Sequence, residues 1–392
     1  MTNLEKTTEL QKGKSFVTLT GKVKISDKTF GGEITSPTTG YKYARINLGV
    51  ETAEGNVVYG EMMGGYAPSN PVIYAMDKEN QAIQVNWADR LNESVVESIA
   101  DFKLYKVGVE KGEDGRTIIK KFLSPIDVEA YLKEHLKDGM EVTVKGSFGF
   151  SEYKEDTQRK FQIQNIFLAY QKRDEKTNEL LPVDYRADFV QTVLLDEDSF
   201  KRITKDDAKE GEVVVQAKVV DYVGKRDNVV IKKNMPFSLP IVVKINKENP
   251  EMTEKILNLL FKVKKGQVRE LGIEGHIVEG YEKQDVGNAD IKLSAEIQEL
   301  IAMGLYSEEE AKKKMTVRGN KVSKLVFARP LLVKDEKNPN GTLDMNDNKY
   351  KPEDLIVALP EKEEADPLAD VHDQGSSTGG AGGNDWMKAL GI

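Results

Sequence analysis

The sequence predicts a mainly β protein that contains two small five-stranded barrels. Segments of alternating apolar and polar residues recur from residue 16 to residue 334, as expected for strands that bury one face. The order of three strands, one helix and two strands occurs twice. The last residues are rich in Gly, Ser and acidic side chains, so they cannot bury a core and are expected to be disordered.

The composition limits the chemistry that the chain can perform. There is no Cys and there are three His, namely His135, His276 and His372. Disulfides and thiolate metal sites are excluded and a multi-histidine zinc site is disfavoured, so no metal and no cofactor is predicted. The net charge of −8 is concentrated in residues 353–392, which hold nine Asp or Glu and two Lys. A polar N-terminus and the lack of a membrane-length apolar run predict a cytoplasmic location, in the host cytoplasm if the protein is viral.

The first barrel is expected over residues 15–172, after a flexible N-terminus over residues 1–14. Its helix begins with Ser124 as the cap and Pro125 in the first turn. Residues 26–40 are expected to form a loop, and residues 64–124 an insertion with a hairpin over 102–109 and 116–123. The five strands are predicted at residues 16–25, 41–50, 57–63, 141–150 and 160–170.

A charged linker over residues 173–182 leads to the second barrel, expected over residues 183–335. Asn249 and Pro250 begin its helix, and further helices are expected at 294–303 and 307–315. The strands are predicted at residues 212–222, 228–233, 237–245, 267–279 and 321–334. Five strands with a helix between the third and the fourth are typical of the OB fold. The sequence therefore predicts two OB-fold-like barrels with helical insertions, followed by a disordered acidic tail over residues 336–392.

The first two strands of the first barrel are predicted to bind single-stranded nucleic acid on their outer face. Alternation places Lys22 and Lys24 on this face of the first strand and Tyr41, Tyr43 and Arg45 on that of the second. Unpaired bases stack on tyrosine rings, and cationic side chains neutralise the phosphates. The alternative is an ordinary solvated sheet face.

Tyr153, Arg159 and Lys160 lie in or beside the loop between the fourth and fifth strands, which is a usual ligand contact in OB folds. Phe148 and Phe150 either join them or continue the inward phase of the strand. Packing is favoured for Phe148 and binding for Tyr153.

The second barrel offers cationic and aromatic candidates for nucleic-acid contacts. These are Lys218, Tyr222, Lys225, Arg226, Lys232 and Lys233. The lysine run at residues 312–314 follows three glutamates and fits i,i+4 pairing on a solvated helix better than phosphate binding.

No catalytic residue is predicted. The sequence has no Gly-x-x-x-x-Gly-Lys-Ser/Thr loop, and nothing places a nucleophile beside a base. Residues 344–348 begin like a calcium loop, but Lys349 replaces the required Gly and Leu355 the bidentate Glu, so a turn is expected. Asp196 and Asp198 fit a solvated loop better than a magnesium site.

An apolar tip ends the acidic, Gly/Ser-rich segment. It consists of Asp385, Trp386, Met387, Leu390 and Ile392. Apolar side chains on a polar tether indicate a docking element for another protein.

The paired barrels and the tail resemble a bacteriophage-type single-stranded-DNA-binding protein. The resemblance implies sequence-tolerant DNA binding in replication, recombination or repair, with a tail that recruits a polymerase, helicase or recombinase. The Gly/Ser spacer, Lys388 and Ile392 depart from the unbroken acidic ending with a terminal Phe of the bacterial members. Two other classes remain open, namely a virion structural or assembly protein and a non-catalytic nucleic-acid-binding subunit of a replication enzyme. RNA also remains open as the ligand, because nothing in the sequence reads a 2′-hydroxyl.

Overall fold

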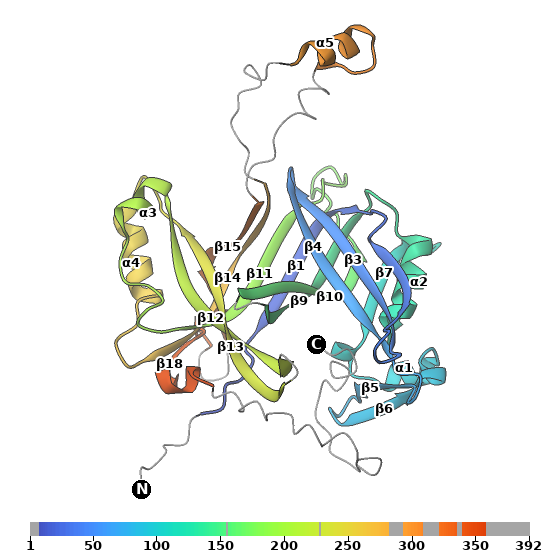
Figure 1. Ribbon diagram of the computed structural model, residues 1–392, viewed down its shortest axis with the longest axis horizontal. Coiled ribbons are helices and arrows are strands. Elements are labelled where there is room, and N and C mark those ends of the chain that lie inside the picture. Colours follow the sequence, from blue (N-terminus) through green and yellow to red (C-terminus); the bar gives the residue numbers. More distant parts are fainter. Residues whose placement is uncertain are drawn as a thin grey trace, which may run out of the picture.

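The computed structural model describes residues 8–153, 156–226, 229–281, 293–308, 321–334 and 339–357. The described chain is mainly β, as predicted, and most of its strands belong to one continuous sheet that curls into two barrel-like halves (Figure 1). None of the helices in these ranges has the length and apolarity needed to cross a bilayer.

The first half has the strand order expected of an OB-like barrel. Its neighbouring strands follow the order β1-β3-β4-β10-β9, and β9 pairs with β1 again. The barrel closes where β10 runs parallel to β4, with Phe161 opposite Gly60. The strands are β1 (Ser15–Lys24), β3 (Lys42–Ala53), β4 (Asn56–Tyr66), β9 (Glu141–Tyr153) and β10 (Asp156–Leu168).

The second half repeats this order as β11-β12-β13-β15-β14, and it closes through parallel pairing of β13 with β15 at Ile241 and Leu325. Its strands are β11 (Arg186–Leu195), β12 (Glu212–Arg226), β13 (Val229–Lys244), β14 (Val268–Tyr281) and β15 (Lys321–Pro330).

Two strand predictions in the second half were wrong. The strands expected at 228–233 and 237–245 are one strand, β13, because Met235 and Phe237 keep the inward phase on either side of Pro236. The first strand, β11, was missed because the polar Gln191 occupies an inward position and interrupts the alternation.

A capped helix follows the third strand in both halves. The side chain of Ser124 accepts a hydrogen bond from the Ile126 amide at the start of α2 (Pro125–His135). Asn249 accepts one from the Met252 amide at the start of α4 (Pro250–Leu260). Both predicted starts are confirmed, and both helices bury leucine side chains in the core, as the OB order requires.

The insertion in the first half forms a small subdomain with its own apolar cluster, which includes Ile99 and Leu104. Arg90 holds it to α2 through two hydrogen bonds to Asp127, at 2.9 and 3.0 Å. Its elements are β5 (Val72–Met76), β6 (Ala82–Asn86), η1 (Trp87–Asp89), α1 (Glu93–Ser98), η2 (Asp101–Lys103) and the predicted hairpin β7 (Tyr105–Lys111) and β8 (Thr117–Phe122). Within the expected loop 26–40, a short strand, β2 (Phe30–Thr35), pairs with β3.

The remaining elements belong to the second half or its connections. They are α3 (Lys205–Glu210), α5 (Ala295–Ala302), β16 (Leu332–Val333), β17 (Thr342–Leu343), β18 (Met345–Tyr350) and η3 (Pro352–Leu355). Residues 309–315 of the helix expected at 307–315 lie outside the described residues.

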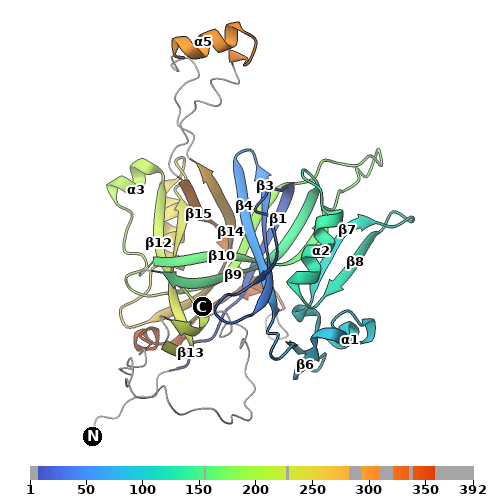
Figure 2. The same cartoon turned by 45° about the vertical axis from the view of Figure 1, so that its right-hand side comes forward.

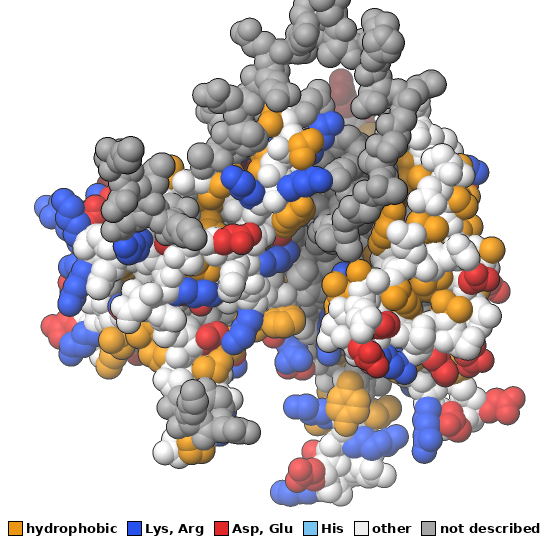
Figure 3. Space-filling view, turned by 90° about the horizontal axis from the view of Figure 1, so that it is seen from below, with side chains coloured by type: hydrophobic (Ala, Val, Ile, Leu, Met, Phe, Trp, Pro, Cys, Tyr) orange, Lys and Arg blue, Asp and Glu red, His pale blue; other side chains and the backbone are white. Residues whose placement is uncertain are grey.

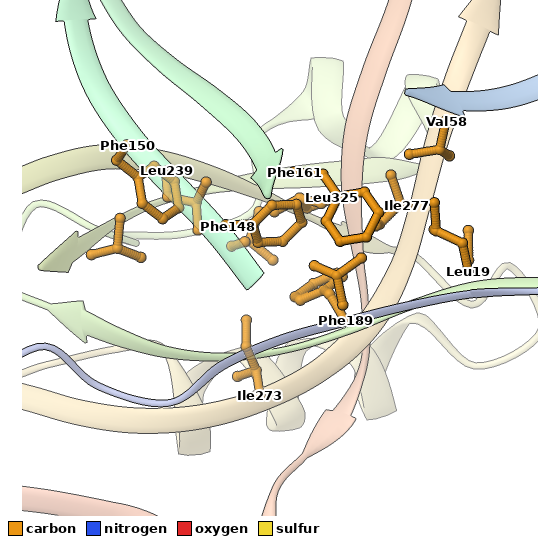
Figure 4. Close-up of a cluster of buried hydrophobic side chains, with 14 of the residues drawn as sticks. Leu19, Val58, Phe148, Phe150, Phe161, Phe189, Leu239, Ile273, Ile277 and Leu325 are labelled. Atoms are coloured by element: carbon orange, nitrogen blue, oxygen red, sulfur yellow. The ribbon is translucent and has the colours of Figure 1, made fainter. Parts of the chain in front are cut away.

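The two halves share one hydrophobic core. The first strands pair antiparallel, with Val17 opposite Phe189. The β9–β10 hairpin reaches across to β12 and β13, as Figures 1 and 2 both show. Figure 4 shows Phe148 and Phe150 of β9 among Leu239 and other side chains of the second half. The barrels are therefore packed together rather than joined only by a linker.

Both ends of the described chain are folded, which corrects the two terminal boundaries. Leu10 and Tyr350 are buried in one apolar cluster with Val268. The Tyr350 hydroxyl accepts a hydrogen bond from the Gln11 amide at 3.1 Å. The turn expected at 344–348 falls mostly in β18, which pairs with β14. A flexible N-terminus was predicted over residues 1–14 and a disordered tail from residue 336. Residues 8–14 and 339–357 are folded instead, because they cover apolar surface of the second half.

Candidate nucleic-acid interface

The outer face of β1, β3, β4 and β10 places an exposed ring between two lysines. Lys24 of β1 lies opposite Gly49 of β3, and Gly49 lies opposite Tyr59 of β4. Because Phe161 lies opposite Gly60 in the parallel pair, the preceding Lys160 falls beside Tyr59. Tyr59 is 61% exposed, so this row combines an accessible aromatic face with a cation on each side.

Gly49 allows the Tyr59 ring to lie close to the sheet. A Cβ atom at position 49 would be 2.9 Å from Tyr59 Cε1, which is shorter than a normal contact. Tyr59 was not among the predicted site residues. The sequence contained the information needed to predict it. Val58 and Met62 are buried positions of β4, and alternation therefore turns Tyr59 outward.

Acidic side chains on the same face hold the cations in place. Glu61 pairs with Arg45 at 2.8 Å and with Lys160 at 3.4 Å. Lys24 pairs with Glu51 at 2.8 Å, and this hydrogen bond raises the pKa of Lys24. The cationic side chains of these pairs are 45–50% exposed, so solvent screens the pairs and a phosphate can replace the carboxylate at low cost.

Lys22 also lies on this face. It is exposed and is opposite Glu51 in the register of β1 and β3. The predicted cations Lys22, Lys24, Arg45 and Lys160 are thus brought onto one surface.

Tyr41 is not exposed on the outer face, contrary to the prediction. Its side chain is only 4% exposed, and its hydroxyl accepts a hydrogen bond from the Gly65 amide at 3.0 Å. Burial raises the pKa of Tyr41. The residue precedes β3, so the alternation of that strand does not govern where the ring goes. Tyr43 is half-buried and its ring stacks on Tyr41, with centroids 6.3 Å apart, so it offers only part of its surface to a base.

Arg159 joins the two barrels instead of lining a loop for phosphate. Its guanidinium lies 3.2 Å from Glu279 Oε1 and 3.0 Å from Ser323 Oγ, both in the second half. It also sits over the Phe148 ring, 5.1 Å from the centroid. Burial lowers the pKa of Arg159. The prediction failed because the β9–β10 hairpin crosses to the neighbouring barrel, and the same crossing buries Phe148, as favoured, and Phe150.

Two candidates in the second barrel form ion pairs that hold the fold. Lys218 pairs with Asp196, and Arg226 pairs with Glu152 of β9. Asp196, one of the two residues weighed as a magnesium site, is the partner of Lys218 in this pair. Among the residues described, no group of three or more acidic or histidine side chains is arranged to hold a metal ion.

The other candidates of the second barrel are dispersed around the β12–β13 hairpin. Tyr222 and Lys225 are half-buried, whereas Lys232 and Lys233 are exposed. Tyr153 is exposed near the tip of the β9–β10 hairpin, which the pair of Glu152 with Arg226 fixes beside β12. These residues lie at the meeting point of two hairpins and not on the face around Tyr59. The tip residues Asp385, Trp386, Met387, Leu390 and Ile392 lie outside the described residues.

Cationic side chains are not confined to the face around Tyr59. Figure 3 shows Lys and Arg interspersed with hydrophobic side chains across the middle of the surface seen from below, and Asp and Glu more frequent towards its right-hand side. Charge alone therefore does not select a binding surface. The face around Tyr59 is distinguished by an exposed ring between two lysines.

Comparison with known proteins identifies no family. No protein-family model matches the chain, and no curated protein matches it. Two similar solved structures are a deletion variant and the wild-type form of the single-stranded DNA binding protein from Thermus aquaticus. The variant aligns over 68% of this chain and 88% of its own, with 13% identity and a TM-score of 0.28; the wild type aligns over 69% and 87%, with 11% identity and a TM-score of 0.29. With TM-scores this low, the two structures carry no argument about a ligand of this chain. A proposal about the ligand has to rest on the residues of the face around Tyr59.

Proposed function

We propose that the chain binds single-stranded DNA without strong sequence preference, on the outer face of β1, β3, β4 and β10. The observation that carries the proposal is the row of Lys24, Gly49, Tyr59 and Lys160 across four neighbouring strands. A base stacks on Tyr59, and the backbone on either side of it meets a lysine. A duplex hides its base faces and gains nothing from such a ring.

Stacking and phosphate neutralisation make separate contributions. Stacking on an aromatic side chain is worth about 1–3 kcal/mol per base and tolerates any base, because every base has a π-face. When the lysines and Arg45 exchange Glu51 and Glu61 for phosphates, they displace the counterions that surround the DNA, so binding weakens as salt rises. The proposal involves no turnover.

The deciding experiment compares two exposed tyrosines. Tyr59→Ala is expected to reduce affinity for fluorescent oligo-dT by about 5- to 150-fold, measured by anisotropy at two salt concentrations. Tyr74→Ala, which removes an exposed ring from β5 of the insertion, is the matched control. Equal affinities of both variants and the wild type would reject the face as the binding site.

The biological setting is part of the same proposal. We place the chain in the cytoplasm, in phage DNA replication, recombination or repair, with the apolar tip at residues 384–392 recruiting a partner protein. Removing residues 384–392 should leave oligo-dT affinity unchanged and abolish capture of a replication or recombination protein. Lack of any oligo-dT binding would favour a virion assembly role, and tighter binding of oligo-rU than oligo-dT would favour RNA. Stoichiometric co-purification with a replication enzyme would indicate a subunit of that enzyme.

A further inference from the structure

Helix α4 carries a second apolar stripe that faces solvent. Thr253, Leu257 and Leu260 are its buried residues. Met252, Ile256 and Leu259 are 49%, 37% and 65% exposed, and their i, i+4, i+7 spacing places them along one line of the helix. Scattered apolar residues on a surface are ordinary, but an aligned set on one helix is typical of an interaction surface.

The described chain ends on the same barrel as this stripe. The Arg269 guanidinium donates to the carbonyl oxygens of Leu259 and Leu260, at 2.7 and 3.0 Å, at the end of α4. It also makes a bidentate pair with Asp347 of β18, at 2.6 and 2.8 Å. From β18 the chain continues to Val357, which packs beside Val268 in the apolar cluster of Leu10 and Tyr350.

The length of the remaining chain is sufficient to return to α4. Residues 358–384 separate Val357 from the apolar tip and are rich in Gly, Ser and acidic residues. A flexible chain of this length has an end-to-end distance of roughly 30 Å. The helix itself is only about 16 Å long, so the whole stripe lies within reach.

Charge favours this pairing at the end of α4. The exposed Lys262, Lys264 and Lys265 follow the helix, whereas Lys255 on the helix itself is accompanied by Glu251 and Glu254. The segment that would approach them is acidic, with Asp385 directly before the first apolar residue of the tip. Trp386, Met387 and Leu390 are the apolar side chains available to cover the stripe.

We propose that Met252, Ile256 and Leu259 form the docking site for the apolar tip of the same chain, residues 385–392. The contact covers the tip when no partner is present, and a partner protein has to displace it. The docking site lies on the second barrel and the row around Tyr59 on the first, so the contact does not depend on nucleic-acid binding and is tested without DNA.

The test uses the full chain labelled with 5-fluorotryptophan. The chain has two Trp, so the ¹⁹F spectrum should contain two resonances, and Trp386→Phe assigns them. The Trp386 resonance is expected to differ from that of a synthetic peptide of residues 384–392, and to move to the peptide position in the double variant Ile256→Asp, Leu259→Asp. Both replaced side chains are exposed, and Leu91→Asp, at an exposed position of the insertion, is the control that should leave the resonance in place.

Two further measurements keep the outcome decisive. Trp386→Ala, which leaves α4 untouched, should increase amide hydrogen exchange of α4 if the tip covers it. A Trp386 resonance at the peptide position in the unmodified chain, or one that the double variant does not move, would overturn the proposal. A resonance that shifts with protein concentration would assign the contact to a second copy and overturn the intramolecular assignment. Unaltered oligo-dT affinity in the double variant separates this result from any failure of the DNA-binding face.

Discussion

Arg159 of the first barrel and Glu279 of the second form an ion pair, with Nη2 and Oε1 3.2 Å apart. Only 15% of the arginine side chain is exposed. Asn56, the first residue of β4, adds a second link, because it accepts from the Glu279 amide at 2.6 Å and donates to the Ile277 carbonyl at 3.2 Å. The barrel that carries the Tyr59 face is therefore fixed to its neighbour by polar contacts as well as by the shared core.

Replacing Arg159 should lower the stability of the fold more than the affinity for DNA. Arg159→Ala leaves Glu279 without its cation, and we expect the free energy of unfolding in urea to fall by roughly 2–3 kcal/mol. Arg116→Ala, at a highly exposed arginine, is the control and should change it by less than about 0.5 kcal/mol. A variant of normal stability that has lost DNA affinity would restore Arg159 as a phosphate contact.

A variant of Tyr41 should likewise lose stability without losing affinity for DNA. Tyr41→Phe removes the acceptor of the Gly65 amide, so the free energy of unfolding should fall by about 0.5–1.5 kcal/mol. Affinity for oligo-dT should be unchanged, because the ring is buried. Weaker binding without a loss of stability would show that Tyr41 reaches the ligand.

Gly49 should be necessary for the position of the Tyr59 ring. In Gly49→Ala the new methyl group would lie 2.9 Å from the ring, which has to tilt away from the sheet. We expect about a 3- to 10-fold loss of oligo-dT affinity, part of the value of one stacked base. Gly31→Ala is the matched control, since its nearest neighbours would be at 3.5 Å. Equal affinities of the two variants would show that the ring needs no support from position 49.

The salt dependence of binding should identify the phosphate contacts. Lys24→Ala and Lys160→Ala should each reduce the slope of log K against log salt by about 0.7–1. Lys201→Ala removes an exposed lysine of the second barrel and should leave the slope unchanged. A reduced slope in all three variants would indicate a general field effect rather than a local track.

The pair of Asp347 with Arg269 should make stability depend on pH. The hydrogen bond from Arg269 lowers the pKa of Asp347 below the ordinary aspartate value of 3.8. A carboxylate whose pKa is lower in the folded state stabilises the protein at pH values above its pKa in the unfolded state. This contribution disappears as the pH falls through the pKa of the folded state. Asp347→Asn should therefore be less stable than the wild type in urea at pH 7, and the difference should shrink below about pH 4. A difference that stays constant down to pH 2 would contradict this role.

The two core helices and most of the strands followed from local patterns. Ser124 and Asn249 cap helices as predicted, because a side-chain acceptor before Pro at the first turn satisfies an amide that the helix leaves free. Alternation in β1 and β3 placed Lys24 and Arg45 correctly on the outer face. The missed strand β11 and the division of β13 show the limit of that pattern, since one buried Gln or one Pro is enough to hide a strand.

The sequence by itself determined which side chains alternate inward and outward along the strands of the first barrel, and hence the cations of the face around Tyr59. Only the tertiary structure decided that Arg159 and Arg226 serve the contact between barrels, that Tyr41 is buried, and that residues 339–357 belong to the fold. The physical reason is that alternation fixes the face on which a side chain lies, whereas distant segments of the chain decide what covers that face. Because the β9–β10 hairpin crosses to the second barrel, Arg159 forms an internal ion pair there. No local sequence pattern predicts that crossing.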